Sequence, residues 1–110
     1  DISTVEKSMN QINELSKSPK ANINQLVRWV ENKDVHADKI SNVVTQYFLK
    51  QRINPVGSDN KKEYKGYTAK LSVLHKIMFH SMKSKQTTDT KHTQKMSALL
   101  EEFHELYHPK

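Results

Sequence analysis

A chain of 110 residues, of which 35% are hydrophobic and 27% charged, is long enough for one small domain and too short for a second core. The absence of cysteine excludes a disulfide framework, a thiolate metal site and a cysteine nucleophile. No stretch approaches the roughly 18 consecutive apolar residues that span a bilayer, and the first residues lack the layout of a secretory signal. We therefore expect a single soluble, intracellular domain over residues 1–110, with no membrane partner.

The net charge of +6 is concentrated in the middle third of the chain. Residues 50–85 carry nine basic and two acidic side chains, whereas residues 1–49 carry six of each. A field this localised favours a polyanionic or phosphorylated partner. A lysine-rich face that only keeps the domain soluble explains the same charge equally well.

Two helices are predicted in the first third of the chain. A Ser-x-x-Glu capping box begins at Ser3 and apolar residues recur at helical spacing from Val5, which predicts a helix over Thr4–Ser16. Ser18-Pro19 places a capping hydroxyl before a proline at the first helical position, which predicts a second helix ending at Glu31. The lysine-bearing turn between them suits an anion, although ordinary capping explains it as well. The buried face predicted for the second helix consists of Ile23, Leu26, Val27 and Val30.

A third helix and a long loop are predicted next. Asn32-Lys33-Asp34 interrupts the apolar pattern, and Asp34 is a suitable cap for a helix running to about Arg52. The β-branched residues of Asn42–Leu49 also allow a strand, but the helical period fits better. The fourteen residues from Ile53 to Gly66 contain several turn signals and predict a loop of unusual length, which is typical of functional or mobile segments.

The central element of the prediction is a helix over Tyr67–Lys83, whose apolar stripe is wide enough to need helices on both sides. Ser84–Thr93 lacks large apolar residues and predicts a second loop. A last helix is predicted over Thr93–Tyr107, with Pro109 ending it. The chain is therefore predicted to be all-α, with five or six helices.

One short motif resembles a metal site. His104-Glu105-Leu106-Tyr107-His108 has the H-E-x-x-H pattern, which places two zinc-binding imidazoles on one helix face beside a glutamate base. Leu106 belongs to the apolar stripe, however, and no third ligand follows, so surface histidines near a helix C-terminus are the better interpretation. No glycine-rich phosphate loop or serine nucleophile elbow is present. The sequence therefore predicts a binding domain that is not an enzyme, without metal, cofactor or small-molecule substrate.

Several segments match one known family. Ser16-Lys17 ends the first helix, Trp29 lies in the second, and His36-Ala37-Asp38-Lys39-Ile40 opens the third, with Gln46-Tyr47-Phe48-Leu49-Lys50 at its far end. Lys70-Leu71-Ser72-Val73-Leu74-His75 lies in the central helix. With these segments the chain resembles the CTD-interacting domain, which is similar to the VHS and ENTH domains. The resemblance implies a right-handed superhelix, in a divergent or truncated member that lacks the family's last helices.

The resemblance also implies a function. CTD-interacting domains bind the phosphorylated heptad repeats of the RNA polymerase II C-terminal tail, which implies a nuclear protein of transcription termination or RNA processing. Met78 stands where the family has a hydrogen-bonding aspartate or asparagine, which places the usual binding mode in doubt. The residues assigned to the peptide and its phosphates are Ser16, Lys17, Lys20, His75, Met78, Lys83 and Lys85.

Two other functions fit the same sequence. A helical RNA-binding domain, similar to the PWI domain, would contact phosphates through Arg52, Lys61, Lys62 and Lys65, and its affinity would fall steeply with salt. A protein-interaction scaffold would use an apolar groove and ignore phosphate, so its binding would not depend on ionic strength.

Overall fold

The computed structural model describes residues 1–18, 20 and 22–108, and these residues contain helices and no strand. The all-α prediction is thus confirmed, but the expected superhelix of five or six helices is not formed: the chain is a four-helix bundle. Its second helix continues without a break into a π-helical segment, η1. The elements are α1 (Ile2–Ser16), α2 (Ile23–Asn42), η1 (Val43–Arg52), α3 (Lys61–Gln86) and α4 (Lys91–Tyr107).

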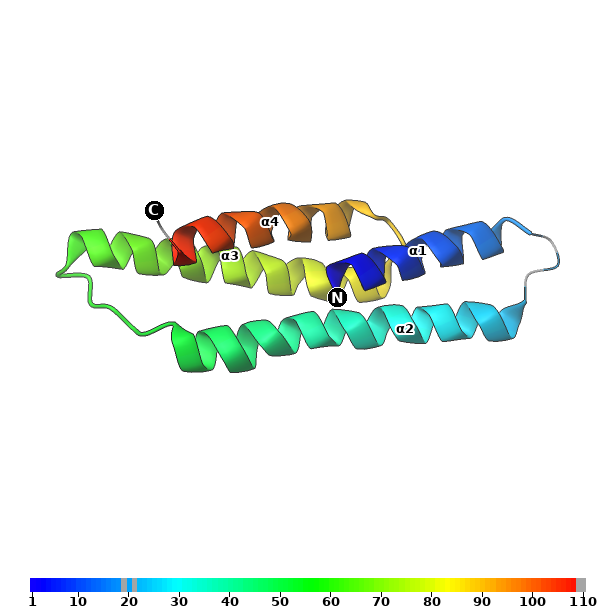
Figure 1. Ribbon diagram of the computed structural model, residues 1–110, viewed down its shortest axis with the longest axis horizontal. Coiled ribbons are helices and arrows are strands. Elements are labelled where there is room, and N and C mark those ends of the chain that lie inside the picture. Colours follow the sequence, from blue (N-terminus) through cyan, green and yellow to red (C-terminus); the bar gives the residue numbers. More distant parts are fainter. Residues whose placement is uncertain (19, 21, 109–110) are drawn as a thin grey trace.

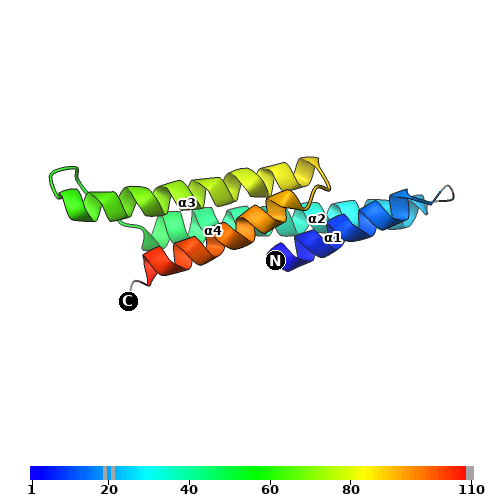
Figure 2. The same ribbon diagram turned by 90° about the horizontal axis from the view of Figure 1, so that it is seen from above.

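The four helices form a rod of 62 × 21 × 20 Å. The continuous α2–η1 segment runs along one side of the rod and α3 along the other, whereas α1 and α4 lie near opposite ends (Figures 1 and 2). α1 packs on α2, and α4 packs on α3. No helix of the described residues is long and apolar enough to cross a membrane.

The core lies in the middle of the rod, where all four helices meet. The stripe predicted for the central helix contributes Leu74 and Ile77, and the last helix contributes Met96 and Phe103. α1 and α4 overlap only in part along the long axis of the rod (Figure 1). The buried cluster consists of Val5, Met9, Ala37, Ile40, Val44, Val73, Leu74, Ile77, Met96 and Phe103.

The start of α2 differs from the prediction. The helix begins at Ile23, where the Asn22 side chain accepts a hydrogen bond of 3.1 Å from the Gln25 backbone N–H. Pro19, the predicted first residue, lies outside the described residues. The predicted buried face is also wrong, because Ile23 is 73% exposed, Val27 48% and Val30 38%. Helix α2 packs mainly on α1, and these three side chains are left exposed. Ser3 lies within α1, so the predicted capping box does not start that helix.

The predicted break at Asn32-Lys33-Asp34 is also wrong. Lys33 is 3% exposed, and its ammonium donates hydrogen bonds to the backbone carbonyls of Ser84 (2.8 Å), Lys85 (3.0 Å) and Thr87 (3.1 Å). These carbonyls belong to the end of α3 and the turn that follows, where no backbone partner is left for them. Lys33, which was predicted to lie in a break between two helices, is therefore buried, and its hydrogen bonds join α2 to the C-terminus of α3.

Both predicted loops are shorter in the structure. α3 already begins at Lys61, where Asn60 caps it by accepting a hydrogen bond of 3.2 Å from the Glu63 backbone N–H. Gly66 lies inside this helix, with no atom near the place where a Cβ would stand. The loop before α4 shrinks to residues 87–90. Polar helix formers such as lysine and glutamate were mistaken for loop residues because neither segment carries an apolar stripe.

Candidate functional site

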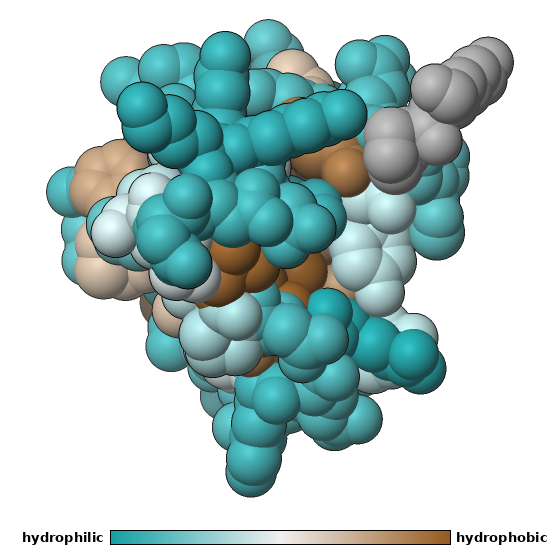
Figure 3. All heavy atoms as spheres, turned by 90° about the vertical axis from the view of Figure 1, so that its left-hand side faces the viewer, coloured by the Kyte–Doolittle hydropathy of each residue, from teal (hydrophilic) through white to brown (hydrophobic). Residues whose placement is uncertain are grey.

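An open groove lies where η1 ends beside the last turns of α4. Its volume is about 780 Å³. Seen from this end of the rod, apolar surface shows in a hollow between hydrophilic side chains (Figure 3). The groove is lined by Tyr47, Phe48, Arg52, Leu100, Glu101, Phe103, His104, Glu105, Tyr107 and His108, and below it is called the η1–α4 groove.

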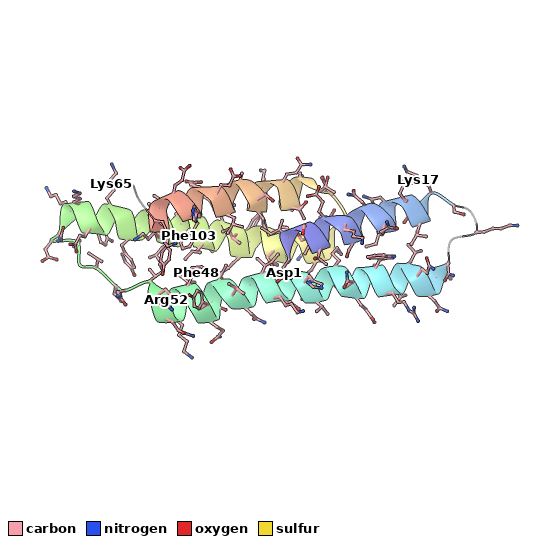
Figure 4. The ribbon with its side chains drawn as sticks, in the orientation of Figure 1. Asp1, Lys17, Phe48, Arg52, Lys65 and Phe103 are labelled. Atoms are coloured by element: carbon pink, nitrogen blue, oxygen red, sulfur yellow. The ribbon has the colours of Figure 1, made fainter. Side chains whose placement is uncertain are left out.

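Aromatic side chains form the floor of the η1–α4 groove. The rings of Phe48 and Phe103 meet edge to face with centroids 4.9 Å apart (Figure 4). Tyr107 stacks on Phe103 with ring centroids 5.3 Å apart. The Arg52 guanidinium lies 5.0 Å from the centre of the Tyr47 ring. Such pairs add stabilisation of about 0.5–1.5 kcal/mol each beyond their buried area. The groove could not be predicted from the sequence, because it forms only where η1 and α4 meet.

A second cavity, of about 510 Å³, lies on the other side of Arg52. Its cationic lining residues are Arg52, Lys62 and Lys70, and Glu63 is the acidic one. Two of the four predicted nucleic-acid contacts, Arg52 and Lys62, are thus brought together. Lys61 and Lys65 are exposed on the first turns of α3, and Figure 4 places Lys65 at the same end of the molecule. This end of the rod carries a positive surface that suits an anion.

Two histidines face each other where α3 meets the start of α4. The Nδ1 atoms of His80 and His92 are 2.9 Å apart, so one ring donates a hydrogen bond to the other. Burial lowers the pKa of His80, and the His92 and Lys95 charges lower it further. The pKa of His92 is lowered first by burial and also by Lys91, Lys83 and Lys95, against an opposing effect of Asp89. Both shifts favour the neutral form of the two rings.

The other histidine pair belongs to the H-E-x-x-H motif. His104 and His108 lie one turn apart at the end of α4, with ring centroids 5.1 Å apart and planes inclined by 60°. Both side chains are exposed and both line the η1–α4 groove, together with Glu101 and Glu105.

The residues assigned to a peptide turn do not share a binding surface with the groove. Lys17, at the end of α1, forms an ion pair of 3.0 Å with Glu14, and Figure 4 places it at the opposite end of the rod from Arg52. Ser16 donates its hydroxyl hydrogen to the carbonyl of Ile12 at 2.6 Å. Lys20 is exposed in the turn that follows.

The assigned residues of α3 are equally dispersed. His75 is exposed, but Met78 is half-buried and packs against the core. Lys83 lies 5.6 Å from the centre of the Phe79 ring, and Lys85 forms an ion pair of 3.0 Å with Asp38 on α2. The assigned residues of α3 therefore do not form one continuous cationic surface in the described part of the chain.

Comparison with known proteins decides the family. The model of the nickel-containing superoxide dismutase family matches residues 1–110, the whole chain. The chain belongs to this family. Comparisons with curated proteins and with solved structures found no match.

Membership in the superoxide dismutase family overturns the resemblance to the CTD-interacting domain. Binding to the polymerase tail and nuclear localisation, which the resemblance implied, are wrong. The two alternative binding functions and RNA as a partner are wrong as well, because the family is one of dismutases. The expectation of a protein that is not an enzyme and has no small-molecule substrate is wrong too, because the family is one of dismutases. The matched segments were short lysine- and leucine-containing stretches, which occur in many amphipathic helices.

The family description names nickel, but the described residues do not provide a nickel centre. The 110 residues contain no cysteine, and the described part of the chain has no group of three histidine, aspartate or glutamate side chains that could hold a metal ion. Imidazole and thiolate groups are the usual protein ligands of such borderline metals. We therefore derive no chemical step through nickel from these residues. The residues assigned to peptide and nucleic-acid binding are not tested by these comparisons, but the functions for which they were assigned are wrong.

Proposed function

We propose that this protein removes superoxide by dismutation, in which two superoxide anions and two protons give one O₂ and one H₂O₂. The observation that carries the proposal is the family match over residues 1–110. Because the match extends over the whole four-helix bundle, the proposal does not depend on a short motif.

The charge distribution supports the proposal. Superoxide is an anion, and the chain has a net charge of +6 with its basic residues concentrated in the middle third. Arg52, Lys62 and Lys70 line one cavity at an end of the rod. A positive surface raises the local concentration of a small anion and its rate of encounter. The contribution that we assign to the described residues is therefore the scaffold and this attraction.

The test is the rate of superoxide loss measured with purified full-length protein, after metal removal and again after loading with Ni²⁺. We expect the nickel-loaded protein to accelerate the loss well beyond the spontaneous reaction, and the metal-free protein to show little acceleration. The controls are the same concentration of free Ni²⁺ and protein loaded with Zn²⁺, which has no redox chemistry. Equal rates for nickel-loaded protein and free Ni²⁺ would refute the proposal.

A further inference from the structure

The H-E-x-x-H motif has no part in the proposed function, yet the structure brings its two histidines together on an accessible surface. We propose that His104 and His108 chelate a divalent transition-metal cation such as Ni²⁺, Cu²⁺ or Zn²⁺, and that water molecules complete its coordination.

The backbone supports the chelate. His104 lies in the last turn of α4 and His108 is the residue that follows this helix, and their rings are 5.1 Å apart at their centroids. The His108 backbone N–H donates a hydrogen bond of 2.9 Å to the His104 carbonyl, so the helical turn that carries both rings is closed. Only side-chain rotation is then needed to direct one nitrogen of each ring to a shared cation.

The electrostatic surroundings favour a cation as well. The site is at the C-terminus of α4, where the helix dipole presents its negative end. Glu101 and Glu105 line the same groove, and Arg52 is the one basic residue among the lining residues other than the histidines. Its guanidinium is held beside the Tyr47 ring at 5.0 Å.

The pair His80 and His92 provides the contrast. Its Nδ1 atoms are occupied by their mutual hydrogen bond, so a metal would have to displace it. Lys83, Lys91 and Lys95 add positive charge around the pair. Of the charged groups that shift the two pKa values, Asp89 is the one with negative charge. We therefore expect a divalent cation to prefer His104 and His108, although both pairs have two imidazoles.

With two imidazoles and no third protein ligand in the described part of the chain, the site resembles neither a closed structural site nor a redox centre. It is a chelating site that loads in addition to any metal used for dismutation. Metal binding by His104 and His108 can therefore be tested independently of superoxide dismutation.

Equilibrium dialysis tests the site. Metal-free protein is dialysed against increasing Ni²⁺, and the nickel bound per chain in addition to any that remains after metal removal is measured. We expect the wild type to bind about one additional Ni²⁺ per chain, and His104→Gln and His108→Gln each to lose this binding, because one imidazole binds too weakly to hold it.

The matched control is His80→Gln, which removes one imidazole of the other pair and should leave the additional binding unchanged. Circular dichroism should show equal helix content for all variants, since His104 and His108 are exposed. Two results would overturn the inference: no additional nickel on the wild type, or additional nickel that both His104→Gln and His108→Gln retain.

Discussion

The hydrogen-bonded pair of His80 and His92 makes the stability of the protein depend on pH. Burial and the neighbouring cations lower the pKa of both rings below the ordinary value of 6.5. At pH values between the folded and the unfolded pKa, the unfolded chain therefore binds more protons than the folded protein. Stability must then rise with pH across this window, and it is lost as the pH falls.

We expect the free energy of unfolding to decrease as the pH is lowered from 7 toward 5, and the decrease to be smaller in His80→Gln and in His92→Gln. The glutamine variants lack a group that must be neutral in the folded state. Urea unfolding at each pH measures the effect, and His75→Gln, which alters an exposed histidine of the same helix, serves as the control. Wild-type pH dependence in both pair variants would contradict this account.

The two histidine pairs also show what can be predicted from the sequence. His104 lies in the last turn of α4 and His108 directly follows that helix, so their spacing of four residues alone indicates their proximity. His80 and His92 are joined across the turn between α3 and α4, and the expected loop over Ser84–Thr93 gave no reason to bring them together. A site formed within one element could thus be predicted, but one that depends on the packing of two elements could not.

Among the helices, the link from Lys33 to the end of α3 has the largest expected energetic effect. Hydrogen bonds from a charged donor contribute more than neutral ones, and buried carbonyls left without a donor are costly. Lys33→Met preserves the apolar stem of the side chain but removes all three hydrogen bonds.

We expect Lys33→Met to reduce the free energy of unfolding by about 3 kcal/mol. The matched variant Lys39→Met changes an exposed lysine of the same helix and should shift it by less than about 0.5 kcal/mol. Chemical denaturation of both variants measures the difference. Similar stabilities for the two would mean that the Lys33 ammonium does not stabilise the turn after α3.

The helices that could be located from the sequence are those with a local apolar stripe. The predictions for α1 and α4 fall within two residues of the observed ends, because each helix has apolar residues at helical spacing that are buried, such as Val5 and Met9 in α1 and Met96 in α4. The break in α2 was wrongly predicted because Lys33 is buried by contacts with residues about 50 positions away. No window of sequence around residue 33 contains that information.

At the scale of the whole molecule, the net charge of +6 determines how an anion approaches. Charges act over about 30 Å at 0.01 M salt and about 8 Å at 0.15 M, so the positive end of the rod attracts superoxide over a shorter range as salt increases. The basic middle third is evident from the sequence but was interpreted as a phosphate-binding region, because charge alone does not identify the anion.

We therefore expect the second-order rate constant of superoxide removal to fall by several-fold when the salt concentration rises from about 0.01 M to about 0.15 M. Lys62→Gln combined with Lys70→Gln should weaken this dependence, whereas Lys17→Gln, at the far end of the rod and paired with Glu14, should not. Rate constants from pulse radiolysis at several salt concentrations provide the measurement. A rate that does not change with salt would exclude attraction by this surface.

The partial overlap of α1 and α4 along the rod has a last consequence. Since α1 and α4 lie near opposite ends, one tip of the rod is built mainly from α1 and α2 and the other from η1, α3 and α4 (Figure 1). Substitutions placed at opposite tips share no partners and should add in their effects on stability. Substitutions at one tip can therefore alter the surface charge and hydrophobicity of that tip without altering the stability contributed by the other tip.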